Sequence, residues 1–115
     1  MCRQVGFESL QLPTGAILAD CYRLSRSVKA FAARATASLA RLDVFVENAG
    51  VAYMTGWHPL PSGVETMLQV NDISTGLLGV LLLPLLAKTA ALPLEPGQKP
   101  FKPHLTLVGS RSEIF

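Results

Sequence analysis

Three short polar stretches carry the side chains that could form a ligand site. Asn48-Ala49-Gly50 follows one apolar run, Asn71 interrupts a second, and Ser110 follows a third. Amide and hydroxyl side chains donate and accept hydrogen bonds, and the turn residues tolerate tight or left-handed backbone. In open α/β sheets, ligands bind outside the carboxyl ends of the strands. We therefore expect Asn48, Asn71 and Ser110 to converge at one edge of a sheet.

The sequence RLDVFVENAG, residues 41–50, must position the first of these stretches. Leu42, Val44, Phe45 and Val46 are apolar and partly β-branched or aromatic, which is typical of a buried strand. We predict a central strand over residues 42–46 whose carboxyl end reaches the site. An ordinary strand followed by an ordinary turn is the alternative for this stretch taken alone.

Helical spacing precedes this strand. Apolar residues recur at every third or fourth position, at Val28, Phe31, Ala32, Ala35 and Leu39. We predict a helix over residues 27–40, with Ser25 or Ser27 as its N-cap.

A second helix is predicted over residues 62–90. Ser62 and Glu65 have the spacing of a capping box, and a long apolar stretch follows them. Asn71 lies inside this helix. A polar residue within an apolar helix indicates either an exposed face or a functional kink.

Two further strands are predicted over residues 7–12 and 105–108. The resulting order is strand, helix, strand, helix, strand. This order indicates an α/β fold, in which a parallel sheet is joined by right-handed crossovers.

The loop after Gly50 carries Tyr53, Trp57 and His58. Exposed aromatic residues at the carboxyl end of a strand could line a substrate pocket, or they could pack over the helix beneath. His58 has no partner at metal-ligand spacing.

Length and composition indicate one globular domain. The chain has 115 residues, of which 50% are hydrophobic and 16% charged, and its net charge is +2. The Lys and Arg residues are scattered, so no nucleic-acid-binding surface is expected. Cys2 and Cys21 lack the spacing of zinc ligands. We therefore expect no metal site, and we interpret both cysteines as free thiols of an intracellular protein.

Neither a secretory signal nor a membrane span is expected. The N-terminal residues lack the apolar run of a signal peptide. Residues 73–87 form the most apolar stretch without a charge, but as a helix they would span about 22 Å, short of the roughly 30 Å hydrocarbon core. Gly76, Gly79 and Pro84 interrupt that stretch. We predict a buried helix there.

The order and spacing of these pieces resemble those of the short-chain dehydrogenase/reductases. RLDVFVENAG resembles the family's NNAG segment, LQVN resembles the active-site Asn in its long central helix, and LTLVGS resembles the strand that ends at the catalytic Ser. The stretches SVKAFAARA and LLLPLL are similar to those of retinol-dehydrogenase-like members. The resemblance covers residues 27–112, about three quarters of the chain.

The resemblance implies where a cofactor would bind. Asn48, Ala49 and Gly50 would support the sheet and border the adenosine side of NAD or NADP. Glu47 stands where the family more commonly has Asn.

The resemblance also implies catalytic roles. Asn71 would kink its helix and hold a water of the proton relay. Ser110 would hydrogen-bond the substrate carbonyl and orient it for hydride transfer. Ser112 is the alternative for that Ser, because Arg111 disturbs the local match.

Two motifs of the family have no counterpart in the sequence. One is the TGxxxGxG turn, which places the pyrophosphate at a helix N-terminus, and the other is the YxxxK that follows the Ser. We therefore expect a partial Rossmann-like three-layer α/β fold with a parallel sheet, a single partial domain over residues 1–115 that lacks the first two strands and the C-terminal part. The strand of residues 42–46 would then be unpaired on one side.

These expectations lead to three functional hypotheses. The first is an NAD(P)-dependent oxidoreductase of the cytoplasm, acting on a hydrophobic carbonyl or alcohol, present as an incomplete chain that is inactive alone. The second is a non-catalytic partner of an intact dehydrogenase, which would form a homo- or hetero-dimer through the apolar helical stretch from Ile73 to Ala87. The third is a truncated product without a function.

Overall fold

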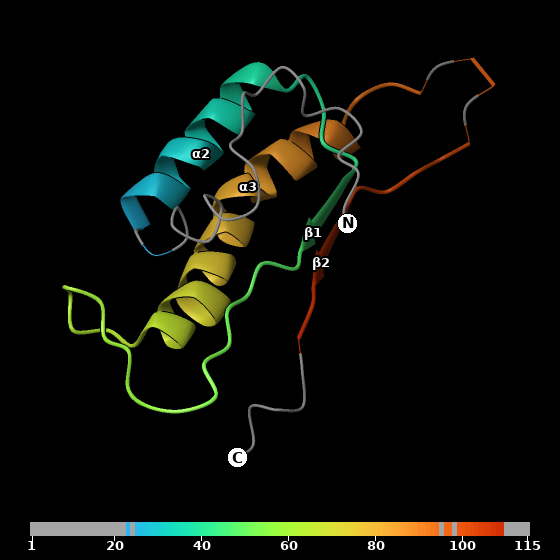
Figure 1. Ribbon diagram of the computed structural model, residues 1–115. Helices are drawn as coiled ribbons and strands as arrows, with labels where there is room; N and C mark the ends of the chain where they lie inside the picture. Colours follow the sequence, from blue (N-terminus) through green and yellow to red (C-terminus); the bar gives the residue numbers. More distant parts are fainter. Residues whose placement is uncertain (1–22, 24, 95, 98, 110–115) are drawn as a thin grey trace.

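The computed structural model describes residues 23, 25–94, 96, 97 and 99–109. Along the chain these residues form α2 (Ser25–Ser38), β1 (Val44–Glu47), the π-helix η1 (Leu68–Ser74), α3 (Thr75–Ala90) and β2 (His104–Leu107). Both long helices lie on the same side of the two strands, with α3 between α2 and the strands (Figure 1). The predicted order of helix, strand, helix and strand is confirmed, and α2 begins two residues before the predicted start.

The two strands pair in parallel, as predicted. Val44 lies opposite His104. At the two ends of the pair, the His104 N–H donates to the Asp43 C=O and the Val108 N–H donates to the Glu47 C=O, both at 2.9 Å. β2 begins one residue before its predicted start, and β1 begins two residues after its own.

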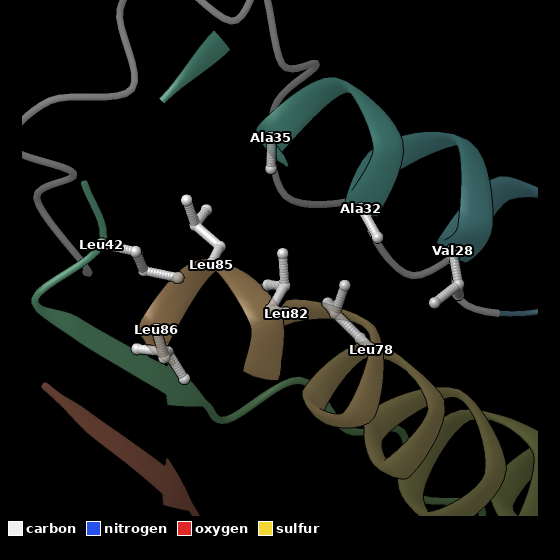
Figure 2. Close-up of a cluster of buried hydrophobic side chains, with 8 residues drawn as sticks. All are labelled: Val28, Ala32, Ala35, Leu42, Leu78, Leu82, Leu85 and Leu86. Atoms are coloured by element: carbon white, nitrogen blue, oxygen red, sulfur yellow. The ribbon is translucent and has the colours of Figure 1, made fainter. Parts of the chain in front are cut away.

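The core lies between α2, α3 and the strands. Small side chains on one face of α2 allow the two helices to approach closely, because ridges and grooves interdigitate best where the contacting side chains are short. Figure 2 shows these side chains facing the leucines of α3, with two further leucines extending the cluster towards the strands. The buried cluster consists of Val28, Ala32, Ala35, Leu42, Leu78, Leu82, Leu85 and Leu86.

Thr89 of α3 anchors the chain just before β1. The Leu42 N–H donates to Thr89 Oγ1 at 2.7 Å, and the same hydroxyl donates to the Leu85 C=O at 2.9 Å. Leu42 and Thr89 are both buried. The hydrogen bond therefore gives the buried Leu42 N–H a partner, and a buried N–H group without one would destabilise the fold.

Only one face of β1 is buried, whereas the sequence predicted a buried strand. Val44 and Val46 are 54% and 53% exposed, while Phe45 is half-buried and Glu47 is buried. Side chains alternate between the two faces of a strand. Among the described residues, helices cover only the face that carries Phe45 and Glu47, so the valines on the other face remain in contact with solvent.

The second helix begins after the predicted Ser62. The Leu60 N–H donates to the Val64 C=O, and this tight turn keeps Ser62 outside the helix. The Glu65 carboxylate accepts a hydrogen bond of 3.0 Å from the Leu68 N–H. Glu65, and not Ser62, therefore satisfies a free N–H group at the helix start.

The sheet of the described residues has two strands. The predicted strand over residues 7–12 lies outside the described part of the chain. Within that part, β1 pairs only with β2, and the unpaired state of its other edge stays a prediction. A parallel strand pair joined by a helical crossover is part of a Rossmann-like α/β fold, which confirms the predicted fold class.

The continuous helix Leu68–Ala90 is long and apolar enough to cross a membrane by length and composition. In the structure 44% of its most apolar window is buried inside the protein. Its buried side forms the core with α2 and the strands, as expected for a core helix.

Candidate functional site

The turn after β1 is held by the side chain of Asn71. Asn71 Nδ2 donates to the Val51 C=O, and the Val51 N–H donates to Asn71 Oδ1, both at 2.9 Å. A Cβ atom added to Gly50 would lie 3.4 Å from Asn71 Oδ1, so the backbone passes close to the amide. The structure thus brings together the first two of the three polar stretches.

Asn71 lies in an irregular part of its helix. η1 is a π-helix, and π-turns inside α-helices are frequent at functional sites. Thr75 Oγ1 donates to the Val70 C=O, and Gln69 Nε2 donates to Ser74 Oγ, both at 3.0 Å. These side-chain bonds provide partners for polar groups in the widened turns. Asn71 is exposed on this π-helical segment, which fits the predicted alternative of an exposed face, and its functional role in a kink stays a prediction.

The structure describes only some of the other predicted site residues. Asn48 and Ala49 are exposed directly after β1. Ser110 and its alternative Ser112 lie outside the described residues, so the predicted convergence of Asn48, Asn71 and Ser110 remains a prediction.

Glu47 is a buried ionisable residue next to the site. Glu47 is 2% exposed, and neither carboxyl oxygen has a hydrogen-bond partner among the described residues. Burial raises the pKa of the Glu47 carboxyl from 4.5 to about 7, because the charged form loses its hydration. Sequence reasoning noted Glu47 only as a departure from the family's Asn. The sequence did contain a signal for its burial: Glu47 lies two residues after Phe45, so both side chains lie on the same face of the strand, the face that packs on a helix.

The aromatic residues of the loop after Gly50 differ in how they pack. Tyr53 packs over the helix: its N–H donates to Met67 Sδ at 3.3 Å and its ring lies 4.2 Å from that of His58. Arg23 Nη2 donates to the Tyr53 hydroxyl at 3.1 Å, which ties the loop to the segment before α2. Trp57 is 68% exposed, so it does not pack on the helix beneath.

A cavity of about 180 Å³ lies at the opposite end of the strands. Asp43, which precedes β1, is one of its lining residues, whereas Asn48 and Gly50 follow β1. The cavity is therefore separate from the candidate site. Among the residues that the structure describes, no cluster of three His, Cys, Asp or Glu side chains could hold a metal ion.

Comparison with known proteins identifies relatives of this chain. It is 35% identical over 111 residues to the short chain dehydrogenase opdN of Penicillium oxalicum, an alignment that covers 93% of this chain and 33% of the relative. It is 42% identical over 85 residues to the short chain dehydrogenase atnD of Emericella nidulans, covering 74% of this chain and 25% of the relative.

A third relative is the short chain dehydrogenase/reductase mfmJ of Annulohypoxylon moriforme, 40% identical over 72 residues, or 63% of this chain and 21% of the relative. No family model and no solved structure matches the chain. The chain spans about a third or less of the length of the curated relatives it matches.

Proposed function

Because the chain belongs to the short-chain dehydrogenase/reductase family, we propose that it is a segment of an NAD(P)-dependent oxidoreductase that reduces a hydrophobic carbonyl or oxidises the corresponding alcohol. We propose further that the 115-residue chain has no catalytic activity by itself and that it is located in the cytoplasm.

The observation that supports this proposal best is the paired contact between Asn71 and Val51. It joins the irregular helix η1 to the turn that follows β1. Two polar stretches far apart in the sequence therefore lie at the carboxyl end of a parallel strand, where α/β proteins bind ligands.

The described residues fit only part of a dinucleotide site. Asn48, Ala49 and Gly50 are exposed, so an adenosine could reach this turn from solvent. The next backbone donor, the Val51 N–H, is already bonded to Asn71. A diphosphate needs several backbone donors, normally from a glycine-rich turn, and the sequence has no such turn. We therefore derive no catalytic step through the cofactor.

The chain's own residues would act by positioning. Asn71 holds the turn through its side chain. Ser110 would donate a hydrogen bond to the substrate carbonyl and so polarise it, by resemblance to the family's catalytic Ser. The proton for the developing alkoxide requires a further acid, and the sequence lacks the YxxxK that supplies it in the family.

The test uses the purified chain. NADPH is titrated by fluorescence, and its absorbance is followed with a panel of apolar aldehydes and ketones. We expect no saturable binding at micromolar NADPH and no oxidation of the cofactor. Turnover that disappears in Ser110→Ala but persists in Ser112→Ala would show that the short chain has a working site. Sequencing the coding region on both sides then tests the family function, which requires a YxxxK in frame.

A second candidate function is that of an interaction partner for an intact dehydrogenase. The continuous helix formed by η1 and α3 exposes Ile73, Val80 and Leu83, which are 41%, 64% and 49% exposed. Together with Gly76 and Ala87, these residues form a series in which the spacing alternates between three and four residues. Such spacing places them along one side of the helix, as in the contact seam of two paired helices, and we call this series the seam. No charged residue lies in this series.

The seam is tested by the mass of the chain in solution. We expect a dimer for the wild type, and a monomer for Val80→Glu, because a charge cannot be buried in an apolar seam without a partner. Lys88→Glu changes an exposed residue outside the seam and should remain dimeric. A monomeric wild type that also fails to co-purify with an intact dehydrogenase would exclude this function.

A further inference from the structure

We propose that the Glu47 carboxyl is a pH-sensitive contact that controls how firmly α3 lies on the sheet and, through the same helix, how firmly Asn71 holds the turn after β1. This device would operate whether or not the chain takes part in catalysis.

The geometry places the carboxyl at the contact between α3 and the strands. A Cβ atom added to Gly79 would lie 3.6 Å from Glu47 Oε2 and 3.5 Å from Leu105 Cδ2. These are ordinary van der Waals distances, so Gly79 lies directly against the carboxyl, but it offers no side-chain hydrogen-bond donor. Glu47 is buried beneath the helix with both oxygens unpaired.

Among the described residues, no ionisable side chain on the elements around Glu47 neutralises its carboxyl. Asp43 pairs with Arg41 before the start of β1, and His104 lies opposite Val44, on the other face of the sheet. Glu47 forms no salt bridge with any other residue that the structure describes. The remaining ionisable residues of η1 and α3 are exposed: Asp72 and Lys88.

Burial makes the protonation state matter for stability. The pKa of the Glu47 carboxyl is about 7 in the folded chain, against 4.5 as its ordinary value. Because the pKa is higher in the folded chain, the folded chain keeps its proton on Glu47 up to a higher pH than the unfolded chain does. The contact is thus strongest below pH 4.5, weakens as the pH rises from 4.5 to about 7, and changes no further above that.

The contact is linked to the candidate site through one continuous helix. Gly79 lies eight residues after Asn71, which is about 12 Å along the helix Leu68–Ala90. An ionised Glu47 would push α3 away from the sheet at Gly79. The same movement would lengthen the hydrogen bonds between Asn71 and Val51, which connect that helix to the turn.

The experiment compares urea unfolding at several pH values for the wild type and three variants. Glu47→Gln keeps the shape and removes the charge. Gly79→Ser places a hydroxyl within reach of Glu47 Oε2, and Gly79→Ala adds the same Cβ atom without a donor, so it is the matched control. Hydrogen exchange of the Val51 amide reports on the turn.

For the wild type and Gly79→Ala, we expect the folding equilibrium constant to fall by up to tenfold for each pH unit between about 5 and 7. Glu47→Gln should show no such fall, and Gly79→Ser a smaller one. After division by the intrinsic exchange rate at each pH, exchange of the Val51 amide should accelerate over the same pH range in the wild type and not in Glu47→Gln. Equal pH dependence in the wild type and Glu47→Gln would overturn the proposal. If Glu47→Gln does not fold, equal pH dependence in Gly79→Ser and Gly79→Ala would overturn it.

Discussion

The side-chain amide of Asn71 pairs with both backbone groups of Val51, twenty residues earlier in the chain. One residue of η1 thereby fixes the path of the chain as it leaves β1. Only an amide can donate and accept in this way, since a carboxylate lacks the donor and an aliphatic side chain lacks both groups.

Replacement of Asn71 tests this contact. We expect Asn71→Ala to lower the free energy of unfolding by about 1 to 2 kcal/mol, because two hydrogen bonds are lost at an exposed position. Asn71→Asp should cost as much or more, since its carboxylate would face the Val51 C=O. Chemical denaturation measures both. The control is Asp72→Ala, at an exposed neighbouring position; an equal loss in that variant would contradict the assignment.

Thr89 gives a second prediction, because its hydroxyl links α3 to the start of the strand. Thr89→Val keeps the shape but leaves the Leu42 N–H buried without a partner. We expect a loss of about 1 to 3 kcal/mol in the free energy of unfolding. Thr89→Ser retains the hydroxyl and should lose clearly less. Similar losses in the two variants would mean that the methyl group, and not the hydrogen bond, matters.

Two adjacent leucines of α3 test the position of the core. Leu82 is 1% exposed and lies in the core, whereas Leu83 is 49% exposed. Leu82→Ala should cost about 2 to 5 kcal/mol of unfolding free energy, because it removes buried methyl groups and leaves a cavity. Leu83→Ala should cost less than about 1 kcal/mol in the monomeric state. The reverse order would place the wrong face of α3 against α2.

The exposed Arg41 and Asp43 pair should contribute little to stability. Hydrogen bonding from Arg41 lowers the pKa of the Asp43 carboxyl below 3.8. A lowered folded pKa means that the contribution is present above pH 3.8 and is lost as the pH falls through the folded value. Asp43→Asn should therefore change the unfolding free energy by less than about 1 kcal/mol at pH 7. An NMR titration of Asp43 that shows an unshifted pKa would refute the pairing.

Much of the described fold could be predicted from local sequence patterns. The spacing of Val28, Ala32 and Ala35 indicated a helix, and the apolar run before Asn48 indicated a strand. Parallel pairing of β1 and β2 followed from the helix between them, because short connections cannot join parallel strands. The family followed from the order of short motifs, and the curated relatives share it.

Long-range contacts decided the rest. An alternating strand has two distinguishable faces, but only the position of α3 determined that Phe45 and Glu47 are covered while Val44 and Val46 are exposed. Local sequence patterns could not predict the hydrogen-bond partner of Asn71 either. Its partner Val51 lies across a loop whose path no periodicity describes.

The sequence by itself determined the type and order of the elements, because backbone preferences and hydrophobic periodicity act over a few residues. Only the tertiary structure decided which polar groups are buried and with which partners. Burial depends on what other segments cover, and at Glu47 the covering helix presents a glycine and no donor. That is why an acid that looks ordinary in the sequence has a carboxyl whose pKa burial raises to about 7.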